Sequence, residues 1–136
     1  MNDGIVWIPI EVVLRIHDEQ LRRHGGDDGV LDRGRLEAAL DRPRNLLSHV
    51  PDSNLEDVAA LLAVAIAKGH PFVDGNKRTA AVVSLMFLRM NGCEINASEA
   101  EIGDVFIAVA EGTMSQGDLA EWFTENTIRS DDWPTE

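Results

Sequence analysis

Nine consecutive residues hold most of the side chains in this chain that could carry out chemistry. They bring together an imidazole, a carboxylate, a glycine, an amide and two cations, in the order His70-Pro71-Phe72-Val73-Asp74-Gly75-Asn76-Lys77-Arg78. The run that follows, residues 79–83, is typical of a helix start, so free backbone N–H groups and the positive end of a helix dipole would face this loop. This arrangement favours an anion such as phosphate as the ligand.

Two of these side chains could take part directly in a reaction. An imidazole can accept a proton from a hydroxyl group at neutral pH, so His70 is the candidate general base. An isolated histidine at this place would more commonly cap the preceding helix. Asp74 could hold Mg²⁺ together with substrate phosphates, because that ion usually binds one or two carboxylates, water and phosphate oxygens. Asp-Gly is also a common turn pair, but no strand-like run follows it, and we therefore favour the metal role.

The remaining polar residues of the segment are candidates for phosphate binding. Gly75 can let a phosphate approach the backbone closely, and Asn76 can donate its amide there or cap the following helix. Lys77 and Arg78 are more specific, because a guanidinium grips phosphate oxygens with two hydrogen bonds and an ammonium adds a compact charge. Two adjacent cations at a helix start are unfavourable by dipole alone, which indicates a bound anion. Lys68 could add a further phosphate contact, or it could simply complement the dipole at its own helix end.

The elements that must position this loop are predicted to be helices. The pattern of apolar residues and caps indicates about six of them, over approximately residues 9–24, 32–41, 55–68, 76–91, 98–111 and 115–128. The third and fourth are apolar nearly all round and should form the centre, with the loop between them. Gly69 should end the third helix and leave His70 just outside it, while Phe72 should point into the core and fix the loop.

Local signals predict where the other helices begin and end. Pro9 suits the first position of the first helix, and the second helix should stop before Pro43, leaving a loop over residues 43–52. Residues 93–97 could form a lone strand-like link. Capping boxes, in which a serine precedes an acidic residue by three positions, should open three of the helices: Ser53 with Glu56, Ser98 with Glu101 and Ser115 with Asp118. His17 is expected to be a structural residue of the first helix.

Length, composition and net charge limit the classes of protein to which this chain can belong. A chain of 136 residues that is 44% apolar suits one all-α domain, here residues 1–129 followed by a mobile tail at 130–136. The single Cys93 excludes an internal disulfide, and no secretory signal or stretch of about 20 apolar residues is present, so we expect a cytoplasmic protein without a membrane partner. The net charge of -12 argues against direct nucleic-acid binding.

The nine residues resemble the signature of the Fic/Doc superfamily, His-x-Phe-x-(Asp/Glu)-Gly-Asn-(Gly/Lys)-Arg, in the form with lysine at the eighth place. That lysine points to the Doc, or death-on-curing, branch. The resemblance covers about residues 8–123 and extends through His17-Asp18, Gly25-Gly26, residues 36–43 and residues 87–92. It implies a compact helical Fic/Doc fold and the toxin of a type II toxin-antitoxin system.

The resemblance also implies a reaction. Doc-like members present the γ-phosphate of a nucleotide, here ATP with Mg²⁺, to a hydroxyl group that His70 would deprotonate. The expected substrate is a threonine of translation elongation factor Tu, whose modification inhibits translation. Lys77 stands where a glycine would cradle a diphosphate for AMP transfer, and Ala81 stands where nucleotidyl-transferring relatives carry a second arginine. Both differences favour a kinase over an AMP transferase, which is the alternative enzyme.

Regulation is expected to come from another protein. The inhibitory pattern (Ser/Thr)-x-x-x-Glu-(Gly/Asn) of many Fic proteins is absent, since its nearest match, Glu111-Gly112, has Ile107 in place of the hydroxyl residue. In Doc-like systems the inhibitor is a Phd-like antitoxin, whose C-terminal segment folds as a helix in a groove beside the active site. A third possibility is a catalytically inactive, antitoxin-binding co-repressor module.

Overall fold

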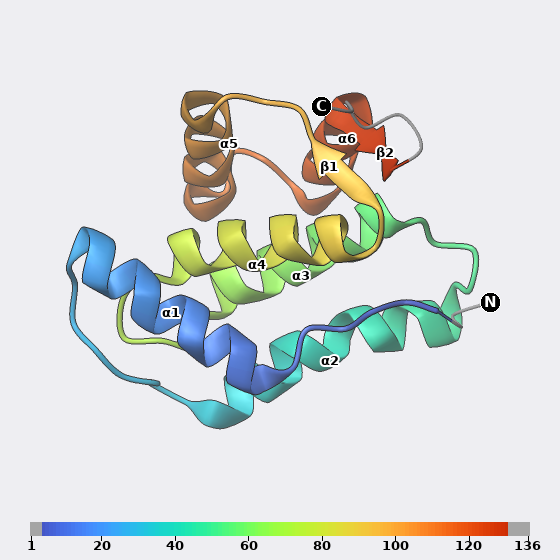
Figure 1. Cartoon of the computed structure of the whole chain (residues 1–136). Helices are drawn as coiled ribbons and strands as arrows, with labels where there is room; N and C mark the ends of the chain where they lie inside the picture. The colour runs from blue at the N-terminus through green and yellow to red at the C-terminus, as the bar shows by residue number, and fades with distance from the viewer. Residues whose placement is uncertain (1–3, 131–136) are drawn as a thin grey trace.

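The fold is a bundle of six helices with a small two-stranded sheet at one end, seen in a computed structural model that describes residues 4–130 (Figure 1). The elements are α1 (Ile10–His24), α2 (Arg33–His49), α3 (Leu55–Gly69), α4 (Asn76–Met90), β1 (Cys93–Ile95), α5 (Glu99–Glu111), α6 (Gln116–Asn126) and β2 (Thr127–Arg129). The predicted all-α fold is confirmed. All of the expected C-terminal tail beyond Ser130 lies outside the described residues.

Helix α3 forms the centre of the bundle. Ten of its fifteen residues are buried, and it packs against α2, α4 and α6. Its sequence alternates small and large apolar residues, so alanines admit neighbouring helices closely while Leu62 and Ile66 fill the space between them. Helix α4 lies beside α3, with α1 along one of its sides and α5 along the other (Figure 1). The loop between α3 and α4 is therefore held by the two most central helices.

Helix α2 is longer than predicted. It continues through Pro43 to His49, so the loop expected over residues 43–52 was wrong for its first seven residues. A proline inside a helix loses one hydrogen bond and costs about 3 kcal/mol. Here Pro43 is buried in line with Leu36, Ala39 and Leu47, which form one apolar stripe along the helix. Packing of this stripe outweighs the local preference of proline.

The predicted start of α3 at Leu55 is confirmed, but its predicted cap and its predicted last residue were wrong. Asn54, rather than Ser53, caps its start by accepting a hydrogen bond of 2.8 Å from the backbone N–H of Asp57. At the other end Gly69 is still helical, and His70 takes the left-handed conformation. At α1, Pro9 is the N-cap residue and the helix begins at Ile10. The capping boxes of Ser98 with Glu101 and of Ser115 with Asp118 are confirmed.

The predicted lone strand has a partner. Strand β1 pairs antiparallel with β2, and Cys93 lies opposite Arg129. The sixth helix was expected to reach residue 128, but it ends at Asn126 because the following residues form β2. Arg129 extends from this strand to the buried Glu56 at the start of α3, with an N–O distance of 2.9 Å. This ion pair ties the small sheet to the central helix.

Across residues 4–130, no helix combines the length and the apolar character needed to cross a membrane.

Candidate active site

The loop between α3 and α4 begins with a strained residue. His70 has φ 49° and ψ 57°, and it is the one residue other than glycine with a positive φ among residues 4–130. Pro71 disfavours the right-handed helical region for the residue before it, so the helix must end here. A left-handed conformation costs a non-glycine residue about 1–2 kcal/mol. The exposed imidazole is thus presented at a fixed turn where α3 stops.

The connection between α1 and α2 supports this loop from one side. Val30 forms an antiparallel bridge with Phe72, the N–H of Leu31 donates to Pro71 O at 2.8 Å, and the N–H of Val73 donates to Gly29 O at 3.1 Å. Phe72 is 1% exposed, which confirms that it anchors the loop in the core. Backbone pairing on one side and an aromatic anchor beneath leave the loop little freedom.

The amide side chain of Asn76 closes the loop from within. Its Oδ1 accepts a hydrogen bond of 3.0 Å from the N–H of Phe72, and its Nδ2 donates to Phe72 O, also at 3.0 Å. The same Nδ2 lies 3.2 Å from Nδ1 of His70. Both amide hydrogens of Asn76 are therefore engaged inside the loop. Gly75, with φ 79° and ψ 15°, occupies the N-cap position of α4 that Asn76 could have taken.

Asp74 is held at both its side chain and its backbone. Its Oδ1 accepts from the N–H of Gly75 at 2.9 Å, and its Oδ2 accepts from the N–H of Asp27 at 3.3 Å. The backbone oxygen of Asp74 lies 2.8 Å from Nε2 of His17, a residue of α1. A Cβ added to Gly26, which has φ 126°, would lie only 2.9 Å from Oδ2 of Asp74. A glycine is therefore required beside this carboxylate.

No motif in the sequence connects these supporting residues with the loop. From the sequence, His17 was expected to be structural, and Gly26 entered only as part of the family resemblance. The available signal was the position of His17 directly after Ile16 on the buried side of α1, where both side chains are at most 8% exposed. A buried histidine needs a hydrogen-bond partner, and here that partner is the backbone of the candidate site.

The loop side chains surround a cavity of about 310 Å³. Its lining comprises Ala67, His70, Val73, Asp74, Gly75, Asn76, Lys77, Arg78 and Ala110. The structure thus brings together every predicted site residue except Lys68. The Nζ of Lys68 lies 3.0 Å from where a Cβ on Gly112 would be, beside the end of α5. This position tests neither a phosphate contact nor the dipole at the end of α3, so both alternatives for Lys68 stay predictions.

The cavity is suited to an anion. Within residues 4–130, neither Lys77 nor Arg78 forms an ion pair with a carboxylate. The first turn of α4 begins at Asn76 without a side-chain cap, so its N–H groups have no intrahelical partners. Two cations and these N–H groups can together neutralise and bind phosphate oxygens.

A single carboxylate borders the cavity. No group of three or more His, Cys, Asp or Glu side chains that could hold a metal occurs in the described part of the chain. Asp74 is exposed, and each of its oxygens accepts only one hydrogen bond, so lone pairs remain available. This donor set is too small for a dedicated metal cage, but it fits a Mg²⁺ ion that arrives with a nucleotide and keeps most of its water.

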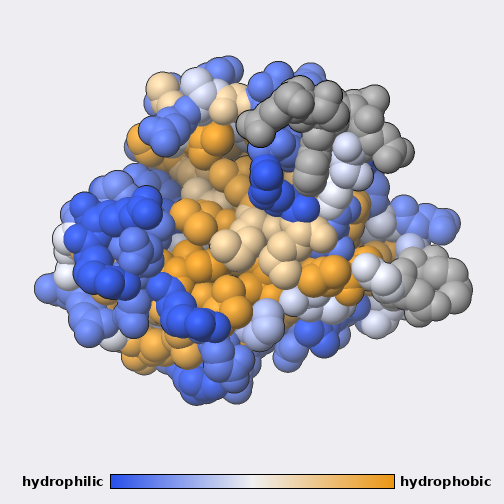
Figure 2. Space-filling model, viewed as in Figure 1, coloured by the Kyte–Doolittle hydropathy of each residue, from blue (hydrophilic) through white to orange (hydrophobic). Residues whose placement is uncertain are grey.

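An apolar groove adjoins the cavity. It has a volume of about 510 Å³ and is lined by Gln20, His24, Lys77, Arg78, Ala81, Val82, Leu85, Glu99, Ile102, Gly103, Phe106 and Ile107. Figure 2 shows an apolar band over α4, between α1 and α5. Lys77 and Arg78 line both the groove and the motif cavity, so the two spaces meet at these cations.

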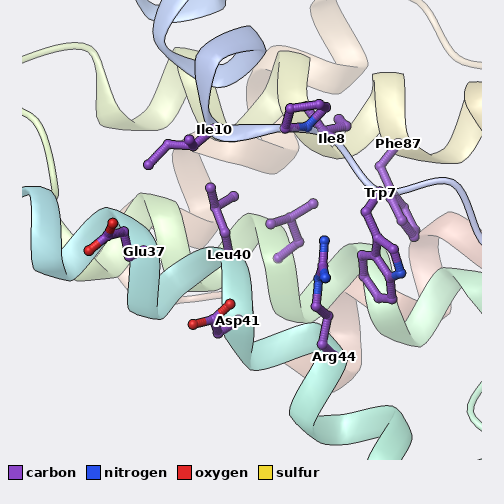
Figure 3. A pocket seen from close by; sticks show the side chains of 10 residues that line it. Trp7, Ile8, Ile10, Glu37, Leu40, Asp41, Arg44 and Phe87 are labelled. Atoms are coloured by element: carbon purple, nitrogen blue, oxygen red, sulfur yellow. The ribbon is translucent and has the colours of Figure 1, made fainter.

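A further pocket of about 380 Å³ lies under the segment that precedes α1 (Figure 3). None of the nine motif residues lines it. Trp7 packs beside Phe87, and the guanidinium of Arg44 lies 5.0 Å from the centroid of the Trp7 ring. Glu37 and Asp41 stand on the same helix as Arg44. This pocket is therefore separate from the predicted site residues, which lie in the loop between α3 and α4 and in the first turn of α4.

Comparison with known proteins gives consistent matches. Residues 7–88 match the Fic/DOC family. Over 111 residues the chain is 37% identical to the protein kinase doc of Escherichia phage P1, which covers 82% of this chain and 87% of that protein. Over 74 residues it is 42% identical to the toxin Doc of Mycolicibacterium smegmatis (strain ATCC 700084 / mc(2)155), covering 54% of this chain and 57% of that protein.

Proposed function

Because the chain belongs to the Fic/DOC family, we propose that it is the toxin of a toxin-antitoxin pair and acts as a protein kinase. It would transfer the γ-phosphate of ATP to a threonine or serine hydroxyl of a translation factor, with elongation factor Tu as the expected substrate. The observation that carries this proposal is the cavity in which His70, Asp74, Lys77 and Arg78 meet at the start of α4.

The chemistry of the site suits phosphoryl transfer. The hydroxyl oxygen of the substrate attacks the γ-phosphorus, the bond from that phosphorus to the β–γ bridging oxygen breaks, and ADP leaves. The hydroxyl proton passes to His70. Such a transfer needs mainly positioning and charge neutralisation, which Lys77, Arg78 and the first N–H groups of α4 can supply. When bound, Mg²⁺ would neutralise phosphate charge from the side of Asp74.

The contact between Asn76 and His70 adds a requirement to this mechanism. The amide of Asn76 is oriented by the backbone of Phe72, so an N–H points at Nδ1 of His70. Nδ1 must then accept, and a neutral imidazole carries its hydrogen on Nε2. Before Nε2 can accept a substrate proton, its hydrogen must move to Nδ1; otherwise the ring must turn over, so that Nδ1 leaves Asn76 and accepts the substrate proton itself. We therefore expect substrate binding to release His70 from Asn76.

Two residues favour γ-phosphate transfer over AMP transfer. Lys77 is half-buried and lines the cavity, so its side chain takes space that a glycine would leave open to a diphosphate. Ala81, one turn further along α4, has no charge with which to hold the far phosphate groups. A nucleotide would therefore bind with its γ-phosphate nearest to His70.

The groove beside the cavity supports regulation by an antitoxin. A Phd-like antitoxin with an amphipathic C-terminal segment could fold as a helix against the apolar side chains of Val82, Leu85 and Phe106. Because Lys77 and Arg78 line both spaces, a bound helix would stand next to the phosphate site. Inhibition would follow from restricted access to those cations.

Labelled nucleotides test the proposed reaction. The purified protein is incubated with Mg²⁺, elongation factor Tu and ATP labelled at either the α- or the γ-phosphate. His70→Ala serves as the inactive variant, and His49→Ala, exposed at the end of α2, is the matched control. We expect γ-label on the substrate with the wild type and His49→Ala, and none with His70→Ala. Label from the α-phosphate would instead mean AMP transfer.

Growth measurements test the biological role. Expression of the wild-type chain alone in bacteria should arrest growth, and co-expression of the antitoxin should restore it. His70→Ala should remove the toxicity yet still bind the antitoxin. A harmless wild-type protein that binds antitoxin would support the inactive co-repressor module instead.

A further inference from the structure

His17 is a buried histidine that lies beneath the active-site loop. Its side chain is 2% exposed, and its ring stacks on Phe72 with centroids 3.8 Å apart and an interplanar angle of 8°. Its Nε2 lies 2.8 Å from the backbone oxygen of Asp74. A carbonyl oxygen can only accept, so Nε2 carries a hydrogen and donates. One side chain of α1 thus contacts both the anchor of the loop and its backbone.

The hydrogen bond fixes a peptide that would otherwise have two orientations. Gly75 has φ 79° and ψ 15°, the values of the third residue of a type II turn. In a type I turn the same residue keeps ψ near about 0° but takes φ near about −90°. The two turns differ by rotation of the peptide between the second and third residues, here Asp74 and Gly75. Glycine tolerates both signs of φ, so this peptide could rotate while α4 stays in place.

Rotation of this peptide would disturb the site directly. In a trans peptide the C=O and the N–H point in opposite directions. With Asp74 O directed at His17, the N–H of Gly75 reaches Oδ1 of Asp74 at 2.9 Å. The rotated peptide would lose both hydrogen bonds and would turn a carbonyl oxygen toward the carboxylate. It would also place a negative partial charge where the start of α4 should attract phosphate.

We infer that His17 is a positioning residue for the proposed phosphoryl transfer: its Nε2–H holds the Asp74–Gly75 peptide in the one orientation that presents the Asp74 carboxylate and the first N–H groups of α4 to the nucleotide. The inference rests on the proposed function for its effect on rate, but the hydrogen bond and the peptide orientation can be measured without any reaction.

Two variants separate the hydrogen bond from the stacking. His17→Phe keeps a flat ring against Phe72 but has no donor, whereas His17→Gln places an amide N–H near the position of Nε2 and has no ring. We expect His17→Phe to remain folded and to lose about 10²-fold in kcat/KM, as for other small displacements in active sites. His17→Gln should recover most of that loss. His49→Phe, at the exposed end of α2, should have the wild-type rate.

NMR of the full chain distinguishes this role from a merely structural one, because packing alone would leave the Gly75 amide signal unchanged. In the wild type the Nε2–H signal of His17 should exchange slowly with solvent, and the amide signal of Gly75 should be single and sharp. In His17→Phe the Gly75 amide should broaden or split, and in His17→Gln it should be sharp again.

Two results would overturn the inference. One is a His17→Phe variant with the wild-type rate and an unchanged Gly75 amide. The other is an equal loss of rate in both variants that follows their melting temperatures, because that would indicate packing alone. If neither variant folds, a fast-exchanging Nε2–H signal in the wild type would still overturn it. If the NMR results hold but the wild type transfers no phosphate, the proposed function fails and the positioning role stands.

Discussion

The side-chain amide of Asn76 lies 3.2 Å from Nδ1 of His70, the candidate base, and is held in that orientation by both backbone groups of Phe72. The residue that opens α4 therefore controls the imidazole at the end of α3. Asn76 is only 6% exposed, so its three contacts are largely shielded from water. Of the two roles predicted from sequence for this side chain, the helix cap is wrong because Gly75 is the N-cap residue, and the phosphate contact stays a prediction. The side chain also organises the loop.

Asn76→Ala should impair both the stability and the rate. The change leaves the N–H and the C=O of Phe72 without partners in a buried site, which we expect to lower the free energy of unfolding by about 3 kcal/mol. It also removes the two hydrogen bonds that hold the loop between α3 and α4 in shape, so the groups that bind the nucleotide lose their fixed positions and phosphotransfer should fall. Asn45→Ala, on the exposed side of α2, is the matched control and should lie within about 0.5 kcal/mol of the wild type by urea unfolding. Equal stabilities for the two variants would contradict the described network.

Lys77→Gly tests which phosphate of the nucleotide reacts. Removing this cation should lower γ-phosphate transfer by on the order of 10²- to 10³-fold, the usual cost of losing one group that stabilises charge in a transition state. The open space should also allow the nucleotide to bind with its α-phosphate near His70. The measurement is the ratio of α-label to γ-label on the protein substrate. An unchanged γ-transfer rate would show that Lys77 does not orient the nucleotide.

The sequence predicted the site better than the ends of the elements that carry it. Six motif side chains meet in one cavity because they lie within one short segment, the loop before α4 and the first turn of that helix, where neighbours in sequence are neighbours in space. Contacts between distant residues were not predictable in the same way. The continuation of α2 through Pro43 depends on packing against α3, and the support of Asp74 by His17 and Asp27 depends on where α1 ends relative to α4.

Glu56 illustrates the same limit. Its spacing from Ser53 indicated a capping box, but its carboxylate instead pairs with Arg129, seventy-three residues away in the chain. Nothing local to either residue indicates this contact. A strand pairing that is itself non-local, between β1 and β2, brings Arg129 to the start of α3.

Arg129→Met should destabilise the fold through this pair. Glu56 is 1% exposed, whereas the Arg129 side chain is 51% exposed, so water screens part of the interaction. Leaving a buried carboxylate without its partner can cost 3–5 kcal/mol, and with this screening we expect about 2 kcal/mol. Arg23→Met breaks the exposed pair with Glu19 and should cost at most about 1 kcal/mol. Equal effects of the two substitutions on urea unfolding would rule out a structural role for the buried pair.

Val82→Asp tests the groove as the antitoxin site. This half-buried valine lines the groove, and a carboxylate there would be covered by the apolar face of a bound helix. We expect the affinity for the antitoxin to fall by on the order of 10²-fold. The measurement is titration calorimetry with the antitoxin, together with the ratio of inhibited to uninhibited phosphotransfer. Val50→Asp, at a valine that is 49% exposed, is the control. If Val82→Asp binds the antitoxin with wild-type affinity, the antitoxin binds at another surface.

Cys93 should make the stability of the protein depend on pH in the alkaline range. Burial raises the pKa of its thiol, an effect that the nearby Arg129 opposes and Glu56 reinforces. An unfolded thiol ionises near pH 8.5, whereas the folded one keeps its proton at that pH. The unfolded state therefore binds fewer protons above about pH 8.5. The contribution of this thiol to the free energy of unfolding is fully present below that pH and is lost as the pH rises toward the folded pKa.

Two measurements check that stability falls as the pH rises. The free energy of unfolding should decline between pH 8 and pH 10 more steeply for the wild type than for Cys93→Ala, which has no thiol to ionise. Alkylation of the folded wild type at pH 8 should also be slow, because the thiolate is the reactive form and Cys93 is 0% exposed. Parallel stability curves for the two proteins, or fast alkylation of the folded wild type, would show that the thiol is less shielded than its buried position in β1 indicates.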